Sequence, residues 1–129
     1  MAVRRMYSNN ILCSDAYLAL PFSAQSLYIY LNTRADDDGF VNSPRTAVRT
    51  IGADEADLAL LIERGYLLAF GNGVVAIKHW RAHNQLRKDR YTPTRYQELF
   101  SSLSISDAGE YIPTPTDPWQ PIGNPGKVR

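Results

Sequence analysis

The chain has 129 residues, of which 44% are hydrophobic and 21% charged, and its formal net charge is +1. This length lies near the usual size of roughly 100–150 residues for one domain, so we expect a single domain with flanking segments. The net charge excludes a uniformly basic nucleic-acid binder. Local clusters of charge are not excluded, because a polyanion responds to charges within about one Debye length.

The single cysteine, Cys13, excludes an intrachain disulfide, and the N-terminus lacks the basic start and apolar stretch of a secretory signal. The longest apolar runs, such as residues 58–62, are far shorter than the roughly 20 residues needed to cross a bilayer. We therefore expect a cytoplasmic protein without a membrane partner.

Two helices are predicted near the N-terminus. Ser14 can cap a short turn that runs through Leu20, and Pro21 interrupts it. Ser23 can cap a second helix, because apolar side chains recur after it at helical spacing. The buried face of this helix is expected to contain Ala24, Leu27, Tyr28 and Leu31.

Residues 34–44, RADDDGFVNSP, predict a turn followed by a short strand at Phe40 and Val41. Three consecutive aspartates and a glycine resemble a calcium-binding loop. That loop needs carboxylates at alternate positions and a glutamate at the twelfth, whereas the twelfth residue counted from Asp36 is Ala47. We therefore interpret this stretch as a turn that ends a helix.

The next helix is predicted to begin at Ser43 and Pro44, since serine caps a helix and proline lacks an N–H that would be unpaired there anyway. Gly52 is expected to end it. The apolar residues of this helix share one face, whereas Arg45 and Arg49 share the opposite face.

The following helix, within GADEADLALLIERG at residues 52–65, is acidic, with four acids against one arginine. Asp54 is expected to cap it, and Leu58, Leu61 and Ile62 are expected to face the core. The opposite face lacks side chains that read base edges or contact phosphates, so we do not expect it to lie in a major groove. That face is either solvated or a protein interface, whose residues would be Ala56, Ala59, Leu60 and Glu63.

Residues 66–70, YLLAF, and 74–80, VVAIKHW, are apolar runs joined by GNG at 71–73, which predicts a β-hairpin. Two short helices separated by a tight glycine-containing turn form a helix-turn-helix. The order helix, strand, helix, helix, hairpin is that of a winged helix-turn-helix. The predicted fold class is therefore mainly α with a small β-hairpin, or α+β.

The basic segment, residues 78–95, contains six Lys or Arg residues and one Asp, a formal charge of +5. Cations interleaved with aromatic and amide side chains suit phosphate contact and base stacking. A solvated, partly disordered segment that follows the hairpin would have the same composition. Arg4 and Arg5 can add to this charge, and the two arginines of the helix that follows Pro44 can contact phosphate or pair with nearby acids. The predicted DNA-binding residues are Lys78, Arg81, His83, Asn84, Arg87, Lys88, Arg90, Tyr91, Arg95, Arg45 and Arg49.

Neither a metal site nor an enzyme active site is predicted. His79 and His83 are four residues apart, but the first falls in a predicted strand. The residue after it is Trp80 where a zinc protease has glutamate, and the single cysteine is distant in sequence. Their imidazoles are expected to be hydrogen-bonded, with a phosphate as one possible partner. GNPGKVR at residues 123–129 lacks the spacing of a phosphate-binding loop. We therefore expect no cofactor and no catalysis.

After Phe100 the composition changes, and five of the eight prolines follow it. We predict a winged-helix domain over residues 1–100, with a core at about 14–80 and a basic extension at 81–100. Residues 101–129 are predicted to be a linker or flexible tail, in which Trp119 is a possible anchor.

Residues 4–91 resemble the N-terminal domain of phage replisome organisers, which is related in fold to the winged-helix N-terminal domain of the primosomal protein DnaD. The resemblance covers about two thirds of the chain. It is carried by RADDDGFV at 34–41, IGA at 51–53, GVVAIKHWRAHN at 73–84 and RKDRY at 87–91.

The resemblance implies a winged-helix module that acts in the initiation of phage or prophage DNA replication inside a bacterial host cell. It implies binding to replication-origin DNA, self-association, and assembly with a helicase loader or helicase. Two other functions stay open: a protein–protein scaffold of a primosome-like assembly without DNA contact, and a phage transcriptional regulator. A regulator should carry base-reading side chains on the helix at 54–64, where they are missing.

Overall fold

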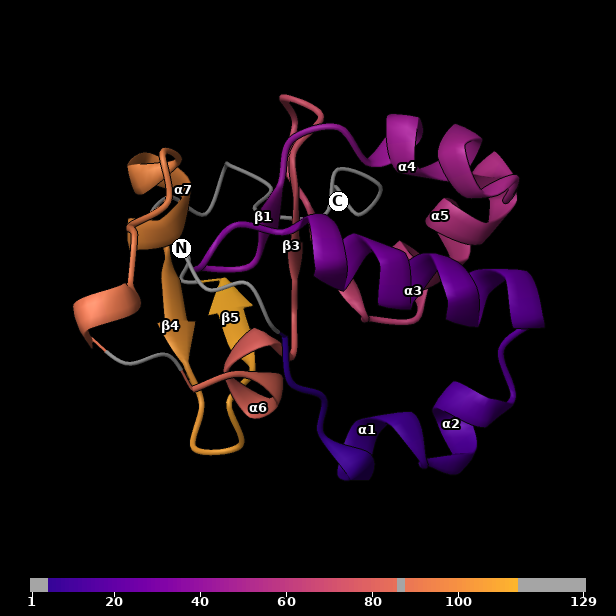
Figure 1. Cartoon of the computed structure of the whole chain (residues 1–129), viewed down its shortest axis with the longest axis horizontal. Helices are drawn as coiled ribbons and strands as arrows, with labels where there is room; N and C mark the ends of the chain where they lie inside the picture. Colours follow the sequence, from indigo (N-terminus) through magenta and orange to yellow (C-terminus); the bar gives the residue numbers. More distant parts are fainter. Residues whose placement is uncertain (1–4, 86–87, 114–129) are drawn as a thin grey trace.

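The computed structural model describes residues 5–85 and 88–113, which form a mixed α and β structure with small antiparallel sheets (Figure 1). The first helices are α1 (Asn9–Leu12), α2 (Asp15–Leu18) and α3 (Phe22–Arg34). The central elements are β1 (Phe40–Val41), α4 (Pro44–Ile51), α5 (Glu55–Glu63), β2 (Leu67–Ala69) and β3 (Val75–Ile77). The last are α6 (Trp80–His83), the 3-10 helix η1 (Lys88–Arg90), α7 (Gln97–Ser101), β4 (Leu103–Ile105) and β5 (Tyr111–Pro113).

Helices α3, α4 and α5 contact one another, and α5 also contacts β2 of a three-stranded sheet (Figure 1). The strand order is β1-β3-β2, with Phe40 opposite Ala76 and Leu67 opposite Ile77. The predicted strand and hairpin are therefore confirmed, and they form one sheet. The completely buried Leu27 and Leu31 of α3 and Leu61 of α5 belong to the core.

The predicted helix boundaries at residues 14, 44, 52 and 54 are confirmed. The Ser14 hydroxyl accepts a hydrogen bond from the Tyr17 N–H at 3.2 Å, α4 ends at Gly52, and Asp54 precedes α5. The prediction that Ser23 caps α3 is wrong, because the helix begins two residues earlier than that cap implies, at Phe22, with Pro21 at its N-cap. Inside the first turn, the Ser23 hydroxyl instead donates to Asp57 Oδ1 of α5 at 2.9 Å.

The third strand ends earlier than predicted. β3 stops at Ile77, and Trp80 begins the short helix α6. The Trp80 ring is 1% exposed, and its Nε1 donates to the Asp37 carbonyl at 2.9 Å. The indole is therefore buried against the acidic turn from α6 and not from the strand.

The prediction of a linker or flexible tail from residue 101 is wrong for residues 103–113. These residues form the β4–β5 hairpin, in which Ser104 lies opposite Ile112. Tyr111 is completely buried, and its backbone N–H donates to the Lys78 carbonyl at 2.8 Å. The rest of the predicted tail, residues 114–129 with Trp119, lies outside the described residues. The longest described helix, α3, has 13 residues, so none in this part of the chain can cross a membrane.

Candidate nucleic-acid interface

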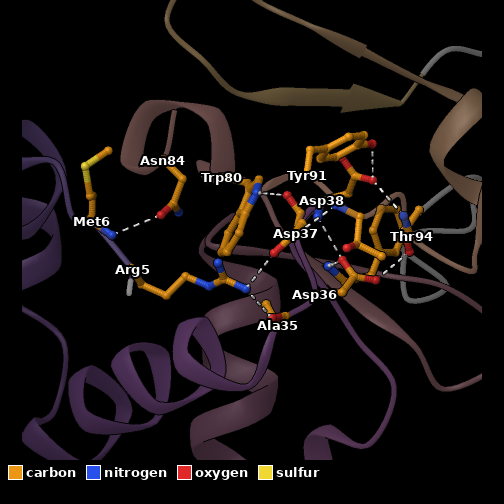
Figure 2. Close-up of polar contacts among 12 residues, drawn as sticks. Arg5, Met6, Ala35, Asp36, Asp37, Asp38, Trp80, Asn84, Tyr91 and Thr94 are labelled. Carbon is orange, nitrogen blue, oxygen red and sulfur yellow. Dashed lines mark hydrogen bonds and ion pairs between the residues drawn. The ribbon is translucent and has the colours of Figure 1, made fainter. Parts of the chain in front are cut away.

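The acidic turn, Asp36–Asp38, connects segments that are far apart in the sequence (Figure 2). Asp37 and Asp38 are buried, at 3% and 0% exposure. A buried carboxylate is costly unless donors surround it, and here protein donors do so. Asp36 Oδ1 accepts from the backbone N–H groups of Asp38 and Phe40, each at 3.0 Å, which closes the turn onto β1.

The Oδ2 atoms of the acidic turn accept hydrogen bonds from residues 91–94 of the basic segment (Figure 2). Asp38 Oδ2 accepts from the Tyr91 hydroxyl at 2.6 Å and from the Thr94 N–H at 2.8 Å. Asp37 Oδ2 accepts from the Thr92 N–H at 2.9 Å, and Asp36 Oδ2 accepts from the Thr94 hydroxyl at 2.5 Å. The part of the basic segment after η1 is thus fixed by four hydrogen bonds.

Three cations that the sequence suggests for DNA contact pair with acids of the fold, two of them with the acidic turn. Arg81 Nη2 lies 3.1 Å from Asp38 Oδ1. Arg5 Nη2 lies 3.3 Å from Asp37 Oδ1, and its guanidinium carbon lies 5.0 Å from the centre of the Trp80 ring. Lys78 Nζ lies 3.8 Å from Glu110 Oε1. These three cations are therefore used within the fold, and the free charge of the basic segment is smaller than its formal charge.

The prediction that His83 contacts DNA is wrong, because its side chain is buried, at 3% exposure. Its Nδ1 accepts from the Ser8 N–H at 2.8 Å, so the neutral ring carries its proton on Nε2, which lies 2.6 Å from the Tyr28 hydroxyl. Burial, with a further contribution from His79, lowers the pKa of His83 to about 4. The ring is therefore neutral at pH 7 and connects α6 to the N-terminal segment and α3.

Two other predicted DNA contacts are also used internally. Asn84 Oδ1 accepts from the Met6 N–H at 3.0 Å, and the Tyr91 hydroxyl donates to the acidic turn as described above. Burial, together with the hydrogen bond to Asp38, raises the pKa of Tyr91 to about 12. The Tyr91 ring is only partly exposed. These contacts help to position the basic segment within the fold.

Three cations of the basic segment remain on the surface of the described chain. Lys88 and Arg90 of η1 are exposed, as is Arg95, whose guanidinium carbon lies 5.4 Å from the Tyr96 ring centre. None of the three has an ion pair with another described residue. We call Lys88, Arg90 and Arg95 the exposed triad. Arg4 and Arg87, which the sequence also indicates, lie outside the described residues.

The α4 helix exposes a second group of polar side chains. Arg45 Nε lies 3.1 Å from Glu55 Oε1. Arg45 therefore pairs with an acid of α5, which is one of the two alternatives predicted for it. Both side chains are more than half exposed, and such a pair contributes only about 0–1 kcal/mol. Arg49 is exposed and has no ion pair within the described residues. Thr46 and Thr50, which carry no charge signal in the sequence, lie on the same exposed side.

The outward face of α5 matches the prediction only in part. Ala56, Ala59 and Glu63 are exposed, but Leu60 is partly buried and packs against the core. The difference arises because α5 contacts α3, α4 and β2, which leaves a narrower free face than the helical wheel predicts. The face presents no cation that could contact a phosphate except Arg64 at its end.

Among the described residues, no group of three or more His, Cys, Asp or Glu side chains has the arrangement of a metal site. The carboxylates of the acidic turn accept from protein donors instead. Comparison of the chain with protein-family models, with curated proteins and with solved structures finds no match.

Proposed function

We propose that the chain is a DNA-binding winged helix-turn-helix module that acts in the initiation of phage DNA replication. Two observations support the fold part of this proposal. The order α3-β1-α4-α5-β2-β3 and the sheet order β1-β3-β2 are those of a winged helix, in which the β2–β3 hairpin is the wing. The replication part rests on the resemblance of residues 4–91 to phage replisome organisers.

The exposed triad carries the DNA-binding part of the proposal. The acidic turn fixes residues 91–94, so Arg90 and Arg95 flank an anchored stretch of chain. A surface that is ordered before binding loses less conformational entropy when DNA arrives. Phosphate contacts of this kind do not depend on base sequence, so the triad supplies affinity and not sequence recognition.

A triple variant, Lys88→Ala, Arg90→Ala and Arg95→Ala, tests this proposal. We expect its affinity for an unrelated duplex to fall and the slope of log K against log salt to become shallower by about 2–3, because each lost phosphate contact removes about 0.9. The measurement is fluorescence anisotropy between 50 and 300 mM salt. Arg64→Ala, which removes an exposed arginine at the end of α5, is the control and should leave the slope unchanged.

An unchanged slope in the triple variant, with the fold intact by circular dichroism, would remove the exposed triad from the DNA interface. Wild-type protein that binds neither duplex nor single-stranded DNA would contradict the proposed function as a whole.

A protein–protein scaffold that self-associates is the second candidate, and a specific observation favours it. Phe22 is 83% exposed and Leu18 is 57% exposed, at the junction of α2 and α3. Ser23 joins this junction to α5 through Asp57. Large exposed apolar side chains of this kind are typical of protein contact sites. A scaffold of this type should bind neither DNA probe in the anisotropy experiment, which separates it from the first proposal.

A further inference from the structure

We infer that a small hollow between the end of α3 and the start of α4 binds a phosphate group of the DNA backbone. This inference rests on the proposed DNA-binding function. The hollow has a volume of about 70 Å³, which suits a group of a few non-hydrogen atoms. Its floor includes the buried Val41 and Ala47, and its rim includes Arg34, Asn42, Ser43 and Thr46.

The rim of the hollow offers hydrogen-bond donors that the fold does not use. Arg34 is the last residue of α3, is exposed, and has no ion pair with any described residue. The side chains of Asn42, Ser43 and Thr46 likewise have no hydrogen bond within the described part of the chain. Thr50 differs, because its hydroxyl donates to the Thr46 carbonyl at 2.8 Å. The free donors therefore come from the end of α3, from the segment between β1 and α4, and from α4 itself.

The charge of the hollow favours an anion. None of the described residues that line it is acidic, whereas Arg34 supplies a full positive charge. The hollow also lies beside the first turn of α4, an eight-residue helix whose dipole adds partial positive charge at that end. Ser43 occupies the N-cap position but makes no side-chain cap bond, so its hydroxyl stays available.

The surroundings of the hollow favour a backbone phosphate over an isolated anion. Arg49 lies on the exposed side of α4, one helical turn beyond Thr46. A strand that crosses α4 can therefore place one phosphate in the hollow and another beside Arg49. Arginine suits this role because its planar guanidinium presents several donors to phosphate oxygens.

Two variants of the full chain test the inference. Arg34→Gln keeps hydrogen-bond donors but removes the charge, and Thr46→Val removes a hydroxyl at nearly constant volume. We expect Arg34→Gln to weaken binding to an unrelated duplex and to reduce the salt slope by about 1. Thr46→Val should weaken binding with little change in slope. The control is Arg64→Gln, an exposed arginine away from the hollow, which should leave affinity and slope unchanged.

A titration with inorganic phosphate, compared with chloride at equal ionic strength, distinguishes a site for a DNA backbone phosphate from a site for free phosphate. We expect the NMR signals of the Asn42 side-chain amide and the Thr46 backbone amide to shift in wild type and not in Arg34→Gln. If these signals shift with phosphate but Arg34→Gln binds duplex as wild type does, the hollow is a free-anion site and the inference is wrong. If wild type binds duplex while Arg34→Gln and Thr46→Val both match it and phosphate causes no shift, the inference fails and the proposed function survives.

Discussion

Asp38 joins more distant parts of the chain than any other side chain described above. Its carboxylate accepts from Arg81, Tyr91 and Thr94, and its backbone carbonyl accepts from the Tyr111 hydroxyl at 2.6 Å. With no exposure to solvent, the carboxylate depends entirely on these donors for stabilisation. A single residue of the acidic turn therefore contacts both the basic segment and the β4–β5 hairpin.

His83 makes the free energy of unfolding depend on pH. Above about pH 6.5 the imidazole is neutral in both the folded and the unfolded chain. Between that pH and about 4, the pKa of folded His83, only the unfolded chain is protonated at this residue, so unfolding takes up a proton. We expect stability to fall by about 2–4 kcal/mol as the pH decreases through this range.

Urea unfolding of wild type and of His83→Gln at several pH values between 7 and 4 measures this effect. The variant lacks the titrating group, so its stability should be lower at pH 7 but should fall less steeply on acidification. His79, whose pKa is also lowered by burial, is present in both proteins and so cancels in the comparison to first order. Parallel pH profiles for the two proteins would contradict the role assigned to His83.

At the scale of elements, the β4–β5 hairpin docks on α6 through backbone contacts. The Ala82 N–H donates to the Gly109 carbonyl at 3.1 Å. A β-carbon on Gly109 would lie only 2.4 Å from the Ala82 nitrogen, and Gly109 has φ +85°. The turn of the hairpin therefore depends on glycine for two separate reasons, its conformation and the close approach of α6.

Comparing Gly109→Ala with Gly73→Ala separates these two reasons. Gly73 has φ +86°, but nothing lies within 4 Å of its β-carbon position. Both variants should lose about 1–2 kcal/mol from the unfavourable conformation, and Gly109→Ala should lose a further 1–3 kcal/mol from the overlap with α6. Chemical denaturation gives both values. Equal losses would show that the hairpin does not dock closely on α6.

The sequence predicts the elements whose signals are local. The start of α4 follows from Ser43 and Pro44, and the β2–β3 hairpin follows from two apolar runs around GNG. The β4–β5 hairpin was not predicted because what holds it is non-local: Tyr111 contacts Asp38 and Lys78, which lie far away in the sequence. Its two strands have only three residues each, and the small and polar residues between them resemble a linker.

The candidate site was predicted only in part, because local sequence signals identify some of its residues and non-local contacts determine the others. The run of cations in the basic segment identifies Lys88, Arg90 and Arg95, which are exposed. Composition cannot show that Arg81 pairs with Asp38, since that pairing depends on how the acidic turn folds back. Nor does it indicate Arg34, because a lone arginine at the end of a helix becomes part of a hollow only through packing of α3 against α4.

At the scale of the whole molecule, the charge is distributed unevenly although its net value is only +1. The acidic α5 and α7, which directly follows the basic segment, lie toward opposite ends of the long axis (Figure 1). The end of α3 and the start of α4 lie between them (Figure 1). This separation is compatible with the proposed DNA binding, because the cations that we propose to contact phosphate lie away from the acidic helix α5.

Chemical footprinting of lysine and arginine side chains, read by mass spectrometry with and without an unrelated duplex, tests this separation most directly. We expect the duplex to protect Lys88, Arg90 and Arg95, together with Arg34 in the hollow, and to leave Arg64 at the end of α5 fully reactive. Protection of Arg64 with no change at the exposed triad would place α5 against the DNA and contradict the account.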